Sequence, residues 1–233
     1  MFPIILLIIL VILVMLVILP FIDEFKKIIP SVNYMGELKK TKPSVINQIY
    51  KILSILDKIL TQNNIEYWID GGTLLGAIRH KGIIPWDDDG DLEIWDRDET
   101  KLLNLKNVFA NHGLVLMPVF YGFKVFFRGA QRIPNFKWKY PAIDIFVMKK
   151  GADYIDYKYE RAQKAFEKCR FKIDDLYPLE RYPFGSLMLS GGSSKNIKNY
   201  LDRCYGADWA THAYLQYDHQ NEKVVFSKKV KLI

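Results

Sequence analysis

The sequence predicts an α/β or α+β fold, because stretches with helical spacing alternate with short strand-like stretches along the chain. Two observations carry this prediction. A long amphipathic stretch follows Pro43, and a strand-like segment at 65–70 leads through two adjacent glycines into a helical segment. Half of the residues are apolar and 14% are aromatic, which excludes a disordered chain. We therefore expect one folded domain over residues 44–233.

The expected elements follow one another with little interruption. They are a helix from Pro43 or Ser44 to about Asn63, a strand at 65–70, a tight turn at Gly71 and Gly72, a helix at 73–80, a strand at 90–95, a helix at 97–111, strands at 114–119, 122–128 and 142–148, a helix around 153–170, a strand pair near 183–190, and a short helix at 194–204. The first helix is the clearest, since its apolar residues recur at helical spacing. These residues are Val45, Ile49, Ile52, Leu53, Leu56, Ile59 and Leu60.

The amino terminus has the composition of a membrane anchor. Residues 1–22, "MFPIILLIILVILVMLVILPFI", carry no charged side chain, and as a helix they would span about 33 Å, slightly more than the hydrocarbon core of a bilayer. A cleaved signal peptide is the alternative, but the segment has neither a basic start nor a small-residue cleavage site near Pro20. We expect a single transmembrane helix at 1–22 and a stem or linker at 23–43.

The net charge limits the classes of ligand that the chain could bind, and the two cysteines limit the bonds and metal sites that it could form. The net charge of +7 is spread over scattered lysine pairs, which suits anionic ligands or a membrane surface. The chain has no motif of a nucleic-acid reader, so we expect no nucleic acid among its partners. Cys169 and Cys204 can form at most one disulfide, and their spacing does not fit a zinc site. We interpret them as buried thiols and not as catalytic groups, and their pairing stays open.

Three carboxylates form a candidate metal site. On a strand, Asp89 and Asp91 would point to the same face, roughly 6 to 7 Å apart at Cα. Two such anions in a partly dry pocket call for a cation, and Mg²⁺ or Mn²⁺ takes oxygen ligands of this kind. Asp144 is a single acid inside the apolar strand "AIDIFV". If the strand at 142–148 lies beside the strand at 90–95, Asp144 completes the site.

The glycine turn predicts a phosphate-binding side opposite the acids. Gly71 and Gly72 allow the backbone to approach a ligand, and the helix that follows, with Thr73 near its start, would present amide groups to phosphate oxygens. Arg79 and Lys81 would neutralise the remaining phosphate charge. Asp87 and Asp88 are interpreted as secondary to the acids that follow them. The histidines are interpreted as surface or structural residues; they are His80, His112, His212 and His219.

The segment "DGGTLLGAIRHKGIIPWDDDGDLEI" at 70–94 closely resembles the signature of the LicD family, which includes bacterial phosphocholine transferases and, more distantly, fukutin. The similarity continues in "IDIF" at 143–146 and in the segment at 182–209. The resemblance implies a nucleotidyltransferase-like fold with a mixed central sheet flanked by helices. It also implies that Asp89 and Asp91 bind the metal, with Asp144 as the third carboxylate.

The function that this resemblance implies is transfer of a phospho-alcohol, such as phosphocholine or ribitol phosphate, from a CDP-activated donor to a glycan hydroxyl. In that reaction CMP would leave, and Asp144 would help to deprotonate the acceptor. By analogy with fukutin the enzyme would be a single-pass, type II protein of a Golgi or ER membrane. The lysines that follow the apolar segment favour the opposite orientation under the positive-inside rule.

Two other functions stay open at this stage. A DxD-type glycosyltransferase would use the same acids to bind a nucleotide-sugar, and its product would be a glycoside instead of a phosphodiester. A membrane-tethered glycan-binding protein would carry the acids as structural groups without catalysis. The glycine turn that precedes the acids favours the phosphotransferase.

Overall fold

The computed structural model describes residues 38–166, 169–213, 216–226 and 228–232. The apolar segment at 1–22 and most of the expected stem lie outside this range. Within it, none of the helices combines the length and the apolar character that crossing a membrane requires. The anchor therefore stays a prediction from the sequence.

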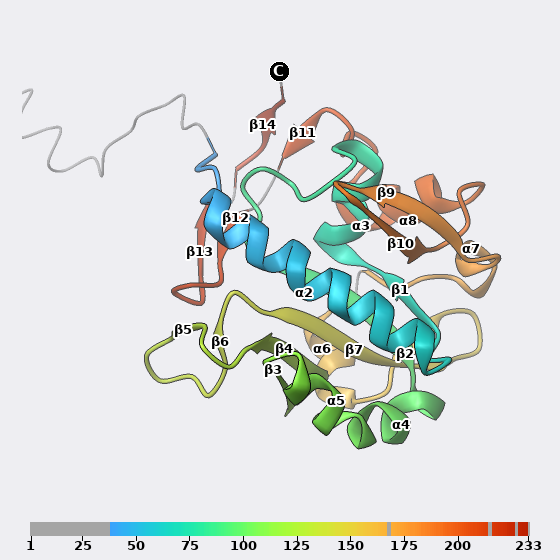
Figure 1. Ribbon diagram of the computed structural model, residues 1–233. Helices are drawn as coiled ribbons and strands as arrows, with labels where there is room; N and C mark the ends of the chain where they lie inside the picture. Colours follow the sequence, from blue (N-terminus) through green and yellow to red (C-terminus); the bar gives the residue numbers. More distant parts are fainter. Residues whose placement is uncertain (1–37, 167–168, 214–215, 227, 233) are drawn as a thin grey trace, which may run out of the picture. The chain divides into compact units, whose positions relative to one another are not determined.

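A mixed, six-stranded sheet forms the centre of the domain (Figure 1). Its strands run in the order β1 (Tyr67–Ile69), β2 (Gly90–Trp95), β7 (Ile143–Lys150), β4 (Gly122–Phe127) and β3 (Leu114–Val119), and β8 (Ile155–Tyr157) pairs with the end of β7. Strands β2 and β7 are parallel, whereas the other pairs are antiparallel. The expected mixed α/β architecture is confirmed.

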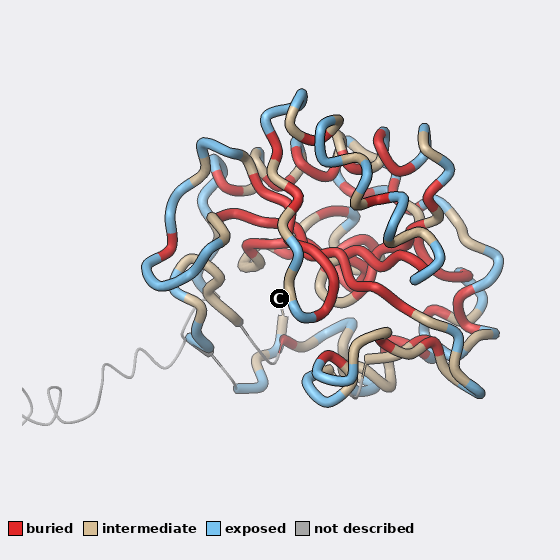
Figure 2. Tube along the Cα trace, turned by 90° about the horizontal axis from the view of Figure 1, so that it is seen from below, coloured by how far each residue is buried: buried red, intermediate tan, exposed pale blue. Residues whose placement is uncertain are grey.

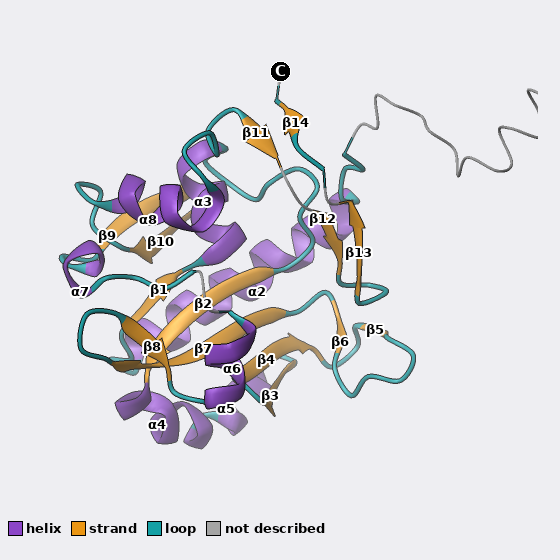
Figure 3. Ribbon diagram, turned by 180° about the vertical axis from the view of Figure 1, so that it is seen from behind, coloured by secondary structure: helices purple, strands orange, loops and turns teal. Residues whose placement is uncertain are grey.

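Helix α2 (Pro43–Gln62) crosses one face of this sheet, and α6 (Glu160–Ala165) lies on the opposite face (Figures 1 and 3). The seven apolar positions that predicted α2 are all buried. Figure 2 shows that burial is concentrated along the central strands and falls off toward the connecting loops. The amphipathic spacing of α2 thus supplies much of the core on one side of the sheet.

Several helix boundaries differ from the sequence-based expectation. The helix expected at 97–111 is divided into a short 3-10 turn (Asp96–Asp98), α4 (Glu99–Asn104) and α5 (Lys106–Asn111), because Leu105 leaves the helical conformation. The helix expected around 153–170 is wrong over its first part. Ile155 and Tyr157 are buried at strand spacing and extend the sheet beside β7, and among the described residues of 153–170 the helix is limited to Glu160–Ala165.

The glycine pair lies inside a helix and not before it. Helix α3 (Gly71–Arg79) begins at Gly71, whose φ of +53° supplies the turn, and Gly72 is already helical. The expected strand pair and the last helix are present as β9 (Glu180–Phe184), β10 (Leu187–Gly191) and α8 (Ile197–Tyr205). Elements that the sequence did not suggest are β5 (Gln131–Arg132), β6 (Lys139–Tyr140), α7 (Ile173–Leu176), β11 (His212–Ala213), β12 (Gln216–Asp218), β13 (Lys223–Phe226) and β14 (Val230–Lys231).

Cys169 and Cys204, whose pairing the sequence left open, form a disulfide. The bond joins the segment before α7 to the end of α8, because the fold brings the two Cα atoms to 4.9 Å although 35 residues separate them in sequence. Tyr200, on the same helix, donates a hydrogen bond from its hydroxyl to Asp70, the residue before α3. Helix α8 is thereby attached at two points.

The α2 packing generates a stability prediction. Leu56→Ala removes a side chain with no solvent exposure from the contact between α2 and the sheet, and it should lower the free energy of unfolding by about 3 kcal/mol. Urea unfolding followed by circular dichroism would measure the change. Lys58→Ala, on the exposed side of the same helix, should change stability by less than about 0.5 kcal/mol. Equal effects of the two variants would contradict this packing.

Candidate metal and substrate site

The parallel pairing of β2 and β7 brings the expected acids together. In this register Asp91 lies directly opposite Asp144, which confirms the predicted neighbourhood of the two strands. Asp89 lies just before β2, and one carboxylate oxygen from each of the three residues falls within 4.8 Å of the others. Three oxygen donors at this spacing fit a hard divalent cation such as Mg²⁺ or Mn²⁺.

The two glycines are explained by the acids that crowd them. A Cβ atom added at Gly71 would lie 2.7 Å from Asp91 Oδ2, and one added at Gly72 would lie 2.6 Å from Asp87 Oδ2. A Cβ atom at either position would therefore displace the Asp91 or Asp87 carboxylate, and at Gly71 the φ of +53° also disfavours any residue other than glycine. This packing reason for glycine holds whether or not the backbone at 71–72 also contacts a phosphate group.

The other residues expected on the substrate side divide into three cases. Thr73 is buried, and its Oγ1 accepts a hydrogen bond from the backbone N–H of Asp91 at 2.8 Å, so this hydroxyl positions β2. Arg79 does line the cavity described below, while donating to the carbonyl oxygens of Trp209 at 2.6 Å and His212 at 3.1 Å. Lys81 is exposed and is not part of the cavity wall.

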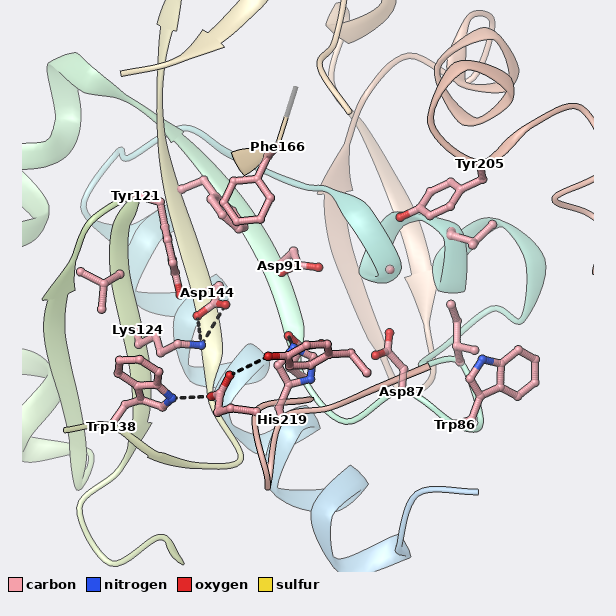
Figure 4. Close-up of a pocket in the computed structure, with 18 of the residues that line it drawn as sticks. Trp86, Asp87, Asp91, Tyr121, Lys124, Trp138, Asp144, Phe166, Tyr205 and His219 are labelled. Carbon is pink, nitrogen blue, oxygen red and sulfur yellow. Dashed lines mark hydrogen bonds and ion pairs between the residues drawn. The ribbon is translucent and has the colours of Figure 1, made fainter. Parts of the chain in front are cut away.

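A cavity of about 720 Å³ opens over the acids (Figure 4). Asp87, Asp89, Asp91 and Asp144 all line it, so Asp87 belongs to the same cavity as the three acids. Much of the remaining wall is aromatic. The aromatic side chains are Trp86, Phe120, Tyr121, Phe136, Trp138, Phe146, Phe166, Tyr205, Trp209 and Tyr217. A volume of this size, with flat apolar walls and a charged floor, suits an organic ligand that carries phosphate.

Burial and mutual repulsion shift the carboxylates of the cavity. Burial, followed by the charge of Asp89, raises the pKa of both Asp87 and Asp91 well above the usual aspartate value. Burial also raises the pKa of Asp144, against the opposing effect of Lys124. Burial acts in the same direction on Asp89, but the charge and hydrogen bond of His219 outweigh it and lower the pKa. Ionising all of these carboxylates together therefore requires more positive charge than Lys124 and His219 supply, which favours a bound cation.

Lys124 is a residue of the site that the sequence analysis missed. It lies on β4 directly opposite Asp144, and its Nζ is 2.7 Å from Asp144 Oδ1 and 3.0 Å from Oδ2. Both side chains are buried. A signal existed, because Lys124 is the only charged residue in the apolar segment "GFKVFF", just as Asp144 is in the segment "AIDIFV". A buried lysine needs a partner as much as a buried aspartate does.

His219 is the second residue that the sequence analysis did not place in the site, since the sequence-based interpretation is only that of a surface or structural residue; the structure supports the structural role. The imidazole lies between two acids, with Nδ1 2.7 Å from Asp88 Oδ1 and Nε2 2.9 Å from Asp89 Oδ2. Asp88 faces this ring and does not line the cavity. The four carboxylates of the acidic run thus serve different purposes. No local pattern predicted the contact, since 131 residues separate His219 from Asp88.

Comparison with known proteins identifies a nucleotidyltransferase family that fits this fold and site. The model of the LicD/FKTN/FKRP nucleotidyltransferase domain matches residues 64–191, which is more than half of the chain. An uncharacterized protein of Rickettsia prowazekii, RP689, is 34% identical over 188 residues, covering 79% of this chain and 65% of that protein.

Two relatives with named activities match shorter segments. Ribitol 5-phosphate transferase FKRP of Homo sapiens is 38% identical over 65 residues, which is 28% of this chain and 13% of that protein. Lipopolysaccharide cholinephosphotransferase LicD of Haemophilus influenzae is 52% identical over 48 residues, or 21% of this chain and 18% of that protein. The chain thus spans slightly less than two thirds of the Rickettsia protein and far less of the other two.

The raised pKa of Asp91 generates a prediction for the metal-free protein. Asp91→Asn should raise the free energy of unfolding at neutral pH by on the order of 1 kcal/mol, since it removes a carboxylate whose pKa is raised by burial and by Asp89. A raised pKa means that the folded wild type binds a proton more readily than the unfolded chain. The advantage of the variant should therefore shrink as the pH falls through the raised pKa and the wild-type carboxyl becomes protonated.

Thermal unfolding in the presence of a chelator, at several pH values, would measure this effect. Asp153→Asn, at an exposed position, provides the control and should leave the unfolding temperature nearly unchanged. A loss of stability in Asp91→Asn at neutral pH would show that the carboxylate is satisfied without a cation.

Proposed function

The chain belongs to the LicD/FKTN/FKRP nucleotidyltransferase family, and we propose that it transfers a phospho-alcohol from a CDP-activated donor to a hydroxyl group of a glycan. The observation that carries the proposal is the meeting of Asp89, Asp91 and Asp144 beside the glycine-rich start of α3. The family match and the chemistry of these three carboxylates support the same class of reaction.

The residues of the cavity can divide the work as follows. A divalent cation held by the three acids would neutralise the donor diphosphate and stabilise the charge that develops on its oxygens. The amide groups at the start of α3, together with Arg79, lie where they can bind the remaining phosphate oxygens. The aromatic walls offer flat surfaces for the cytosine base and the alcohol.

Asp144 is the candidate base for the acceptor. Burial raises its pKa in the metal-free protein, while a bound cation would act in the opposite direction and keep the carboxylate ionised, ready to accept a proton. The acceptor oxygen would attack the phosphorus that bears the alcohol while its proton passes to Asp144. The bond from that phosphorus to the bridging oxygen would break, and CMP would leave with the electron pair. Lys124, 2.7 Å from Asp144, holds this carboxylate in place.

The nature of the alcohol follows from a direct assay. CDP-choline, CDP-ribitol and CDP-glycerol would each be incubated with a glycan acceptor and Mg²⁺ or Mn²⁺, and CMP release measured. The names of the two matched relatives make choline and ribitol the first two donors to test. Asp89→Asn and Asp91→Asn should each reduce release by at least about 100-fold, since each removes a charged ligand without changing volume.

Mass spectrometry of the product distinguishes the alternatives. A phosphodiester-linked alcohol supports the proposal, and a plain glycoside formed from a nucleotide-sugar would identify a glycosyltransferase instead. Full transfer activity in a folded Asp89→Asn variant would refute the assigned role of the acids. Absence of both CDP binding and activity would leave the glycan-binding function.

We further propose that the domain is tethered to a membrane and faces an oxidising compartment, as in a type II protein of the secretory pathway. The apolar segment at 1–22 supports the tether. The disulfide between Cys169 and Cys204 supports the oxidising side, because such bonds persist outside the reducing cytosol. This evidence outweighs the positive-inside preference of the lysines that follow the apolar segment.

Thiol labelling of the full chain in intact cells would test the orientation. The two cysteines should react with a maleimide reagent only after reduction and denaturation, and a variant with both cysteines replaced by serine should not react at all. In a second arm, cells would be lysed and denatured in the presence of the reagent but without a reductant. Labelling in this arm would show that the cysteines are reduced in the cell, which would place the domain in the cytosol.

A further inference from the structure

The C-terminal hairpin reaches into the acid cluster from outside the segment that the family model matches. That match ends at residue 191, whereas β12 and β13 form a hairpin at 216–226. Tyr217, His219 and Glu222 of this hairpin all line the cavity. In Figure 4 His219 lies in the lower part of the view, between Lys124 and Asp87, whereas Tyr205 lies at the upper right. The site is therefore not complete without a part of the chain that lies beyond the matched domain.

The hairpin is fixed to the cavity wall by a second contact. Glu222 Oε1 accepts a hydrogen bond at 2.6 Å from Trp138 Nε1, in the segment that leads into β6. The ring of Tyr217 packs against that of His219 with 4.7 Å between the ring centres. These contacts hold the imidazole where it meets the acids, so its position does not depend on the carboxylates alone.

His219 holds two neighbouring carboxylates at once. Its backbone N–H lies 3.2 Å from Asp88 Oδ2 and its Nδ1 lies 2.7 Å from Asp88 Oδ1, while Nε2 lies 2.9 Å from Asp89 Oδ2. Asp88 thus fixes the ring, and the ring fixes one oxygen of Asp89. A carboxylate has two oxygens and about four lone-pair sites, so Asp89 can accept from His219 and still bind a cation.

Asp89 has particular need of such support. Asp91 and Asp144 are members of the parallel ladder between β2 and β7, whereas Asp89 precedes β2 and lies outside that ladder. Removing a side chain that orients a metal ligand typically lowers metal affinity or activity by about 10- to 100-fold. The chain Asp88, His219, Asp89 has the form of such an arrangement.

We propose that His219 is a positioning residue for the metal site. Asp88 and the hairpin at 216–226 hold the His219 imidazole against Asp89. The inference rests on the proposed metal site, but not on the identity of the donor or of the acceptor. In the opposite role, the imidazole would bind the Asp89 carboxylate and keep the cation from it. Removing His219 would then raise the affinity for the metal instead of lowering it.

Mn²⁺ binding to the full chain, followed by electron paramagnetic resonance, tests the proposal without any substrate. His219→Ala should bind Mn²⁺ about 10- to 100-fold more weakly than the wild type, and Asp88→Asn should show a smaller loss in the same direction. His219→Gln, which can donate to only one of the two acids, should fall between His219→Ala and the wild type. His112→Ala, at the exposed end of α5, is the matched control and should bind like the wild type.

A second readout separates positioning from general damage to the fold. If His219 acts through the metal, excess Mn²⁺ should restore most of the CMP release lost in His219→Ala, and the variant should unfold near the wild-type temperature. If His219→Ala does not fold, Asp88→Asn carries the same test, because it keeps the volume of the side chain.

The possible failures are distinguishable. A wild type that binds no Mn²⁺ contradicts the proposed metal site itself. A wild type that binds Mn²⁺ while His219→Ala binds it equally well contradicts the positioning role. Tighter binding by His219→Ala would instead identify the imidazole as a group that blocks the site.

Discussion

The repulsion among buried carboxylates is the constraint on which the rest of this site depends. The parallel pairing of β2 and β7 places Asp91 against Asp144, and the loop before β2 adds Asp87 and Asp89. Charges gathered in this way would destabilise the fold if nothing offset them. Lys124 offsets part of the charge and His219 another part. The negative charge that remains could be balanced by a divalent cation held by Asp89, Asp91 and Asp144, so the same arrangement that costs stability offers a metal site.

The glycine pair shows how this constraint extends into the backbone. Glycine at positions 71 and 72 lets α3 begin where a Cβ atom would displace the carboxylates of Asp91 and Asp87. Thr73 then binds the backbone of Asp91, and Asp70 is held by Tyr200 on α8, the helix that ends in the disulfide to Cys169. Helix, strand and disulfide thus converge on the placement of one carboxylate.

Much of this could be predicted from the sequence, for reasons that differ between residues. Asp144 could be assigned because a single acid in an apolar strand demands a partner, and the same reasoning applied to Lys124 would have identified it. The spacing of apolar residues predicted α2 but failed at 153–170, where strand-like burial of Ile155 and Tyr157 was hidden in a polar segment. His219 could not be predicted, because its contact with Asp88 depends on how a C-terminal hairpin folds back over a sheet formed much earlier in the chain.

The central claim is that Asp89, Asp91 and Asp144 form one divalent-cation site. Anomalous X-ray scattering from crystals grown with Mn²⁺ and CDP tests it most directly. The account predicts one strong Mn²⁺ peak bonded to an oxygen of each of the three carboxylates, with the diphosphate of CDP completing the coordination and facing the start of α3. A Mn²⁺ peak bound elsewhere in the domain, or CDP bound at the acids without any metal peak, would contradict it.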